Sequence, residues 1–316
     1  MSRAFIFDIY RGTTHDGPGL RSTVFFKGCP LSCEWCHNPE GISPKQRVWW
    51  DSRVCIGCML CHAACKTGAN IPCEAHIKID DTLCVQCGAC VKACPSKAMA
   101  FISKEWTLEK LVNEVIRDKV YYDKTGGGVT ASGGECMMQH DFIVEFFEKL
   151  QNLGVDTAID TCGLIPYSAF EEVLPYTNHV LYDLKLWDDE LHKKYTKQSN
   201  NLILENLRRI AKAIAEGSIK SDLWIRTPLI PGATATKENI TAIGKFIAKE
   251  LHGAVSRWEL CSFNNSCITK YERLNLQWSY QDTPLIDLGT SEALRLAAIA
   301  CGVDEEKVVV TGLISE

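Results

Sequence analysis

Apolar residues recur with helical spacing in four stretches of the chain. They stand three or four positions apart, which places them on one face of a helix and predicts an amphipathic helix in each stretch. The second stretch ends at Gly154, and glycine is common just after the last turn of a helix. The four predicted helices cover residues 107–118, 141–154, 204–214 and 240–251.

Six short apolar runs, typical of strands, are interleaved with these helices. Regular alternation of strand and helix indicates βαβ units and a parallel sheet, and therefore an α/β fold. The runs cover residues 22–27, 128–133, 155–160, 179–185, 223–229 and 257–263.

Polar groups capable of chemistry follow where these runs end. In an α/β barrel the carboxyl ends of the strands form the active face, so we expect these groups to converge there. They are a cysteine loop after the first run, Gly133, Gly134 and Glu135 after the second, Asp160 and Thr161 after the third, and then Asp183, Lys185, Arg226 and Asn264.

The number of cysteines adds most to the functional prediction. The 316 residues include 17 cysteines, and most of them lie between Cys29 and Cys94. In a reducing compartment such density indicates metal or redox chemistry rather than disulfides. The net charge of −5 gives no footprint for nucleic acid, and neither a signal peptide nor a membrane-spanning apolar run is recognisable. We therefore expect a cytoplasmic protein without nucleic-acid or membrane partners.

Two cysteine runs form an internal repeat. The run "CIGCMLCHAAC" starts at Cys55 and "CVQCGACVKAC" starts at Cys84, 29 residues later (84 − 55). Both have the bacterial ferredoxin spacing, in which the fourth cysteine of each run binds the other run's cluster. A zinc module is the alternative, but zinc uses cysteine pairs at longer separation. The predicted 4Fe-4S ligands are Cys55, Cys58, Cys61 and Cys94 for one cluster, and Cys84, Cys87, Cys90 and Cys65 for the other.

A separate loop, "CPLSCEWC", holds only three cysteines, Cys29, Cys33 and Cys36. Three thiolates on a four-iron cube leave one iron open, and an open metal position is typical of a site that binds substrate. The C-x3-C-x2-C spacing, with Trp35 before the last cysteine, resembles the radical S-adenosylmethionine (SAM) superfamily. That resemblance implies that the open iron chelates the methionine moiety of SAM.

Further motifs narrow the resemblance. Taken in order, "THDGPGLRSTVFFKGCPLSCEWCHNPEG", "GGGVTASGGE", "IDTCG", "DLK", "IRTPLIPG" and "ELCSFNNSCITKYERL" resemble the glycyl radical enzyme activating enzymes over essentially the whole chain. The resemblance implies a partial (β/α)6 TIM-like barrel of the radical SAM type with an inserted bacterial-ferredoxin-like domain carrying two auxiliary clusters. The expected divisions are 1–48 for the start of the barrel, 49–104 for the insert and 105–316 for the remainder of the barrel.

The resemblance also implies residue roles. Cys29, Cys33 and Cys36 become the catalytic cluster ligands, and Gly133, Gly134 and Glu135 hold the SAM amino group. Asp160, Thr161 and Asp183 match a monovalent cation site beside the SAM carboxylate, Lys185 lies near that carboxylate, and Asp16 and Arg226 grip the partner's glycine loop. The sequence departs from the family at Cys136, where proline is usual, and at Asn264, where many members have a histidine near SAM. His15 and the six cysteines outside the cluster runs are expected to be structural.

The implied activity is reductive cleavage of SAM to a 5'-deoxyadenosyl radical, which takes the α-hydrogen from a backbone glycine of a partner glycyl radical enzyme. We expect three 4Fe-4S clusters, SAM, a monovalent cation, a flavodoxin or ferredoxin as electron donor, and a monomeric activase. A radical SAM enzyme for a small molecule shares every SAM motif and is the alternative. An electron-transfer protein would explain the ferredoxin runs, but neither the three-cysteine loop nor the GGE and DLK segments.

Overall fold

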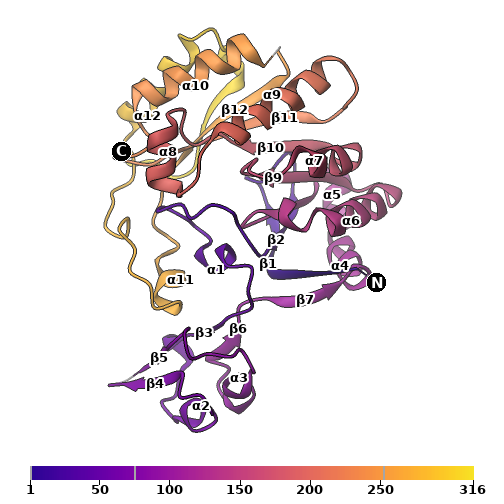
Figure 1. Ribbon diagram of the computed structural model, residues 1–316. Helices are drawn as coiled ribbons and strands as arrows, with labels where there is room; N and C mark the ends of the chain where they lie inside the picture. The colour runs from indigo at the N-terminus through magenta and orange to yellow at the C-terminus, as the bar shows by residue number, and fades with distance from the viewer. Residues whose placement is uncertain (1, 75, 252) are drawn as a thin grey trace.

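A nine-stranded sheet forms the centre of the computed structural model, which describes residues 2–74, 76–251 and 253–316. The strand order is β13-β12-β11-β10-β9-β8-β2-β1-β7 (Figure 1). All neighbours from β2 to β13 pair in parallel, whereas β1 pairs antiparallel with both β2 and β7. The strands are β1 (Arg3–Thr13), β2 (Arg21–Phe26), β7 (Lys104–Thr107), β8 (Gly128–Gly133), β9 (Asp156–Thr161), β10 (His179–Asp183), β11 (Asp222–Leu229), β12 (Val255–Ser262) and β13 (Val308–Thr311).

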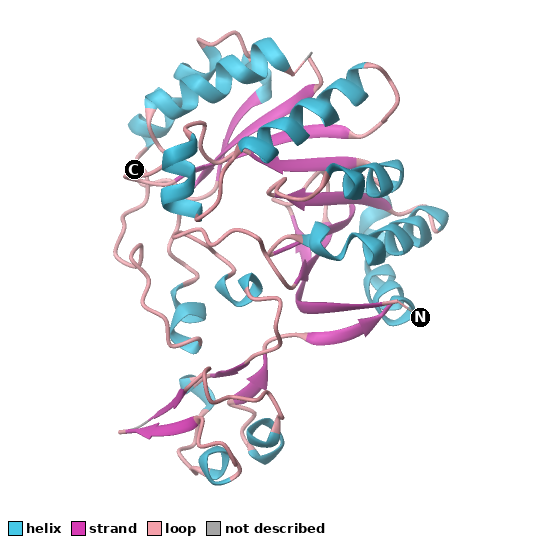
Figure 2. Ribbon diagram, in the orientation of Figure 1, coloured by secondary structure: helices cyan, strands magenta, loops and turns pink. Residues whose placement is uncertain are grey.

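Amphipathic helices cover the outer side of this curved sheet (Figure 2). Their apolar faces are buried against the strands, as Phe146 and Phe147 of α6 illustrate, since both rings are fully buried. Side-chain caps fix several starts: Thr107 accepts from the backbone N of Lys110, and Thr236 from that of Asn239. The helices are α4 (Leu108–Val115), α5 (Lys119–Thr125), α6 (His140–Asn152), α7 (Tyr167–Val173), α8 (Asp189–Thr196), α9 (Asn201–Ala215), α10 (Lys237–Glu250) and α12 (Leu288–Ile299).

The four predicted helices are present as α4, α6, α9 and α10, and the six predicted strands as β2 and β8–β12. The α/β class with a mostly parallel sheet is therefore confirmed. Three strands, β1, β7 and β13, were not predicted. Two of them have only four residues, which is too short for a periodic signal, and their pairing depends on residues far away in sequence.

A small unit projects from the sheet between β2 and β7, at the bottom of Figure 1. It contains β3 (Val48–Trp50), β4 (Asn70–Cys73), β5 (His76–Ile79), β6 (Met99–Phe101), α2 (Leu60–Ala63) and α3 (Ala89–Ala93). β3 pairs with β6 and β4 with β5, both antiparallel. This unit has a separate apolar core that includes Cys61, Cys90 and Met99. The expected domain bounds, 49–104 for an insert, stay a prediction.

The sequence repeat of this unit is also a repeat of its backbone. Met59 precedes α2 and Gly88 precedes α3, and both adopt a left-handed conformation with φ of 56° and 73°. The two positions are 29 residues apart (88 − 59), the same offset as the cysteines. Two further short helices, α1 (Pro39–Ile42) and α11 (Ile268–Arg273), lie beside each other near the junction with the sheet. Among the described residues, no helix is both long and apolar enough to cross a membrane.

Candidate functional site

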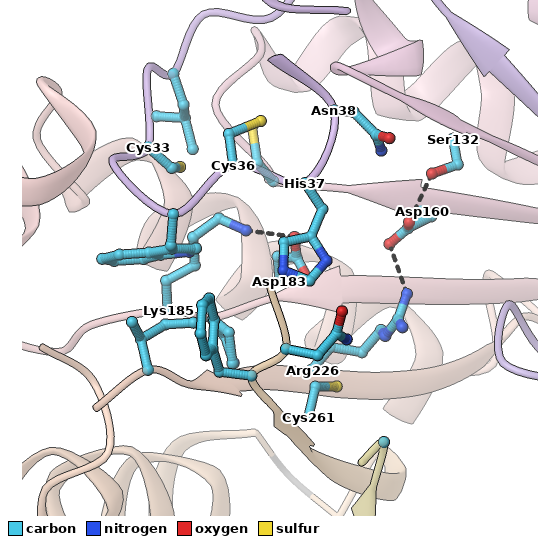
Figure 3. Close-up of a pocket in the computed structure, with 18 of the residues that line it drawn as sticks. Cys33, Cys36, His37, Asn38, Ser132, Asp160, Asp183, Lys185, Arg226 and Cys261 are labelled. Carbon is cyan, nitrogen blue, oxygen red and sulfur yellow. Dashed lines mark hydrogen bonds and ion pairs between the residues drawn. The ribbon is translucent and has the colours of Figure 1, made fainter. Parts of the chain in front are cut away.

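A cavity of about 590 Å³ opens at the carboxyl ends of the parallel strands (Figure 3). The polar residues predicted at successive strand ends largely converge on it, as expected for an α/β barrel. The predicted site residues that line it are Cys29, Cys33, Cys36, Gly133, Gly134, Asp160, Asp183, Lys185, Arg226 and Asn264.

The three-cysteine loop forms one wall of this cavity. Its start is tied to α1, because the backbone N of Gly28 donates to the carbonyl of Gly41 at 2.7 Å and that of Cys29 to Ile42 at 2.9 Å. Burial raises the pKa of the Cys33 thiol to about 12, and burial also raises that of Cys36. A thiol in this state binds a metal only as the thiolate, so metal binding would release its proton to solvent. The wall therefore presents three sulfur donors within one cavity.

Gly133 and Gly134 bring bare backbone to the cavity wall. A Cβ on Gly133 would lie 2.3 Å from the carbonyl oxygen of Phe26, and one on Gly134 would lie 2.3 Å from that of Gly28. Only glycine fits at either position, because both obstacles are backbone atoms. The sequence pattern GG is thus explained by close packing of the β8 end against the cysteine loop.

Glu135 and Thr161 are not among the residues that line the cavity. Glu135 is fully buried, and its carboxylate accepts from the backbone N of Met137 (3.1 Å), the Thr161 hydroxyl (2.8 Å) and the backbone N of Cys162 (2.6 Å). Burial raises its pKa, although these hydrogen bonds oppose the shift. In this structure the two side chains join the ends of β8 and β9 to each other.

Asp160 stands between a neutral donor and a cation on the cavity wall (Figure 3). Its carboxylate accepts from the Ser132 hydroxyl at 2.7 Å and lies 3.2 Å from Nη1 of Arg226. Burial raises the pKa of Asp160 to about 6, with Arg226 opposing the shift and Asp183 adding to it. Ser132 was not predicted, because a serine inside an apolar strand carries no distinguishing sequence signal.

A second ion pair joins Lys185 and Asp183, whose Nζ and Oδ2 are 2.5 Å apart. Burial would lower the pKa of Lys185, but Asp183 and Cys33 outweigh it and the pKa is raised. Lys185 therefore remains a cation at the cavity wall, next to the cysteine loop.

The two residues expected to grip a partner loop occupy different surroundings. Arg226 lies in the cavity wall, where it pairs with Asp160 and with Glu259 (3.4 Å) and donates to the carbonyl of His15 at 3.3 Å. Asp16 accepts from the Thr23 hydroxyl at 2.6 Å and is not among the lining residues. His15, which sequence reasoning left as structural, does line the cavity.

Several lining residues escaped the sequence analysis. His37 directly follows Cys36, and its ring lies 6.0 Å from that of Phe263, which also lines the cavity. Burial lowers the pKa of His37, so its ring is neutral near pH 7. Its position directly after Cys36, a predicted cluster ligand, was the signal that could have identified it.

Asn264, unlike His37, was predicted from the sequence. It lines the cavity, and its side-chain oxygen accepts from the backbone N of Ser266.

The inserted unit brings cysteines of its two runs close to each other. Four of them line one small, apolar cavity: Cys55, Cys58, Cys61 and Cys94. In the other half, Asn70 contacts two thiols, because its backbone N hydrogen-bonds Cys65 and its side chain hydrogen-bonds Cys90. Cys84 lies close enough to Cys90 to influence its ionisation. Cys65 is thus near the second run and Cys94 near the first.

Comparison with known proteins agrees with this geometry. A model of the Radical SAM superfamily matches residues 82–241, and a model of a 4Fe-4S single cluster domain matches residues 15–71. The (2S)-3-sulfopropanediol dehydratase activating enzyme of Klebsiella oxytoca is 39% identical over 288 residues, covering 88% of this chain and 87% of the relative. The trans-4-hydroxy-L-proline dehydratase activating enzyme of Clostridioides difficile is 42% identical over 236 residues, covering 74% of this chain and 76% of the relative.

Among solved structures, a radical SAM methyltransferase from Sphaerobacter thermophilus superposes with a TM-score of 0.50. The superposition covers 97% of this chain and 76% of that one at 13% sequence identity. At this identity the likeness concerns the fold alone.

Proposed function

Because the chain belongs to the glycyl radical enzyme activating enzymes of the radical SAM superfamily, we propose that it takes the α-hydrogen from a backbone glycine of a partner enzyme. Membership makes it an enzyme that uses a 4Fe-4S cluster and SAM. The observation that carries the finer proposal is the convergence of three thiols, bare glycine backbone and fixed charges on one cavity.

The donor set fits the cofactors. Cys29, Cys33 and Cys36 supply three thiolates. A structural site is closed by four protein ligands, so the missing fourth donor leaves a position open for SAM. When bound, such a cluster supplies the electron that cleaves SAM to methionine and a 5'-deoxyadenosyl radical. The protein's own contribution is to bind, orient and exclude water.

Fixed charges supply the binding groups for SAM. Lys185 presents an ammonium group beside the cysteine loop, which suits the methionine carboxylate. Gly133 and Gly134 expose backbone atoms for its amino group. Asp160 and Asp183 add negative charge on the same wall, where the proposed monovalent cation would bind. Asn264 completes this wall and can donate or accept a hydrogen bond.

The partner loop is proposed to enter beside Arg226. This guanidinium already donates to one backbone carbonyl, that of His15, and a glycine loop offers further carbonyls that need donors when buried. Asp16 directly follows His15. Its carboxylate could accept from a backbone N–H of the glycine loop in place of the Thr23 hydroxyl. His15 lines the cavity and joins these two as a third contact.

Three 4Fe-4S clusters are proposed in all. The insert supplies the two auxiliary sets, Cys55, Cys58, Cys61 and Cys94, and Cys84, Cys87, Cys90 and Cys65, and the crossed placement of Cys94 and Cys65 supports them. A ferredoxin or flavodoxin is the proposed electron donor.

The test uses the reduced, cluster-loaded protein with SAM and a candidate glycyl radical enzyme as the partner. Deoxyadenosine and the glycyl radical signal in electron paramagnetic resonance (EPR) are counted in the same sample. We expect Asp16→Asn and Arg226→Ala to cleave SAM slowly but leave the partner without its radical. Arg226→Lys keeps a positive charge beside Asp160 and Glu259. It therefore serves as a second variant in case Arg226→Ala does not fold.

Arg257→Ala is the matched control, because Arg257 also pairs with Glu259, at 2.7 Å, but does not line the cavity. It should retain the full radical yield. A normal yield with Asp16→Asn and Arg226→Ala would show that the docking site lies elsewhere. SAM cleavage driven by a metabolite without any partner protein would favour the small-molecule alternative.

A further inference from the structure

The segment Cys267–Trp278, here termed the bridging segment, contacts both the cysteine loop and the insert. It contains α11 and follows β12 by a short loop. None of its residues was predicted to have a role in the site. Both sets of contacts involve the last residues of α11, and Trp278 beyond the helix adds to the first set.

The first set fixes the cysteine loop around Cys36. The Tyr271 hydroxyl donates to the carbonyl of Cys36 at 2.8 Å, and Trp278 Nε1 donates to the carbonyl of Glu34 at 3.0 Å. The rings of Tyr271 and Trp278 stack with centroids 4.8 Å apart and an interplanar angle of 12°. Both side chains are buried, so these two carbonyls have few alternative donors.

Lys270 adds a buried ion pair on the other side of Cys36. Its Nζ lies 2.7 Å from Oε1 of Glu40 and donates to Oδ1 of Asn38, also at 2.7 Å. Glu40 is buried and its second carboxylate oxygen has no hydrogen-bond partner among the described residues. Lys270 is therefore the cation that balances this carboxylate, and its loss would leave a buried charge unpaired.

The second set grips the beginning of the insert. Arg273 forms an ion pair with Asp51 and lies over the ring of Trp49, 4.6 Å from its centroid. Asp51 caps the turn Ser52–Val54 that leads directly into Cys55. The backbone N of Asp51 also donates to the carbonyl of Ala98 at 2.9 Å.

Ala98 lies close to a second ligand of the same auxiliary cluster, because its backbone N hydrogen-bonds the Cys94 thiol. Arg273 therefore holds a carboxylate that is linked to both Cys55 and Cys94. Tyr271, which holds Cys36, stands only two residues before Arg273 on α11.

We propose that Tyr271 and Arg273 are positioning residues that couple the SAM-cluster loop to the first auxiliary cluster through α11. The coupling is mechanical: a change in how the insert holds its cluster shifts Asp51, then α11, then the carbonyl of Cys36. This inference rests on the proposed assignment of Cys36 and of Cys55 and Cys94 as cluster ligands.

The experiment compares Arg273→Ala with Arg53→Ala in the cluster-loaded full chain. Arg53 is a matched control because it also pairs with Asp51, at 2.8 Å, but belongs to the insert and is largely exposed. Amide hydrogen exchange is measured for residues 33–41 and 49–54. We expect Arg273→Ala to raise the exchange rate about fivefold in both segments. The reason is that the local opening free energy falls by about the contribution of one hydrogen bond. Arg53→Ala should affect 49–54 alone.

A second readout follows Cys36 itself. Tyr271→Phe removes only the hydroxyl, and we expect about fivefold weaker SAM binding, measured by the change that SAM causes in the EPR spectrum of the reduced cluster. Tyr280→Phe is the control. Tyr280 belongs to the same aromatic cluster, and its hydroxyl forms no hydrogen bond with the cysteine loop within the part of the chain that the structure describes. Arg273→Lys should restore most of the protection lost in Arg273→Ala.

Unchanged exchange in 33–41 with Arg273→Ala, when exchange in 49–54 has risen, would overturn the coupling. Equal SAM binding in Tyr271→Phe and Tyr280→Phe would overturn the positioning role of Tyr271. These outcomes are separable from failure of the proposed function, because hydrogen exchange requires no SAM cleavage and no partner protein.

Discussion

Replacing Glu135 by glutamine separates a structural role of this residue from direct contact with SAM. The carboxylate accepts three hydrogen bonds, of 2.6 to 3.1 Å, from groups at the ends of β8 and β9. In Glu135→Gln the amide oxygen can keep the bonds from Met137 and Thr161, but the amide nitrogen then faces the backbone N–H of Cys162. One donor is left buried without an acceptor, at a cost of about 2 kcal/mol.

For a chain of 316 residues, about 2 kcal/mol corresponds to a fall in melting temperature of roughly 3 °C, because the entropy of unfolding is about 2.1 cal/mol/K per residue. Glu135→Ala leaves all three donors unpaired and should be more destabilising than Glu135→Gln. Thr161→Val removes the bond to Glu135 and also the acceptor of the Gly163 backbone N, so it should cost about 2 kcal/mol. The assay is anaerobic thermal unfolding followed by far-ultraviolet circular dichroism, with SAM binding measured well below the transition.

Because Glu135 does not line the cavity, SAM binding to the folded Glu135→Gln protein should change less than about threefold, which is well under 1 kcal/mol. An unchanged melting temperature combined with roughly tenfold weaker SAM binding would refute this reasoning. That result would assign the carboxylate to the ligand rather than to the β8–β9 junction.

Three other outcomes are expected. Gly134→Ala should cost about 2 kcal/mol or more and displace the cysteine loop, since its Cβ would lie 2.3 Å from one backbone oxygen; normal iron loading would contradict this. Cys94→Ala should lower iron from about twelve to about eight atoms per chain while SAM cleavage persists, and a loss of all iron would argue against separate sites. Burial opposes the charge on His179, but Asp156 and Asp222 outweigh it and raise its pKa above 6.5. Its stabilising contribution is therefore complete below pH 6.5 and lost as the pH rises through the raised value, and His179→Gln should remove this part of the pH dependence of the melting temperature.

Local sequence patterns were sufficient where one short segment carries the whole signal. The helix α6 and the strand β9 follow from their own periodicity, whereas the ligand roles that spacing gives to the cysteine runs stay predictions. The convergence of Asp160, Lys185 and Arg226 could also be predicted, because the ends of parallel strands meet at one face.

The remaining features depend on partners far away in the chain. β13 pairs with β12 across about 50 residues, and Tyr271 reaches Cys36 across 235, so neither contact leaves a periodic trace in sequence. Glu135 shows the opposite problem. Its motif indicated a ligand contact, whereas the direction of its side chain, which only the folded structure reveals, is toward Thr161 and the chain interior.

The pairing of β3 with β6 has a consequence for how the chain reaches its folded state. Val48 lies opposite Phe101, so the insert begins and ends at the same place. Without that pairing, β2 and β8 could join only by closing a loop of roughly a hundred residues. An insert that closes on itself removes about half of that length, which saves about 0.6 kcal/mol of chain entropy for each halving. The proposed clusters would stabilise this unit further, and the closed insert would then ease the joining of β2 and β8.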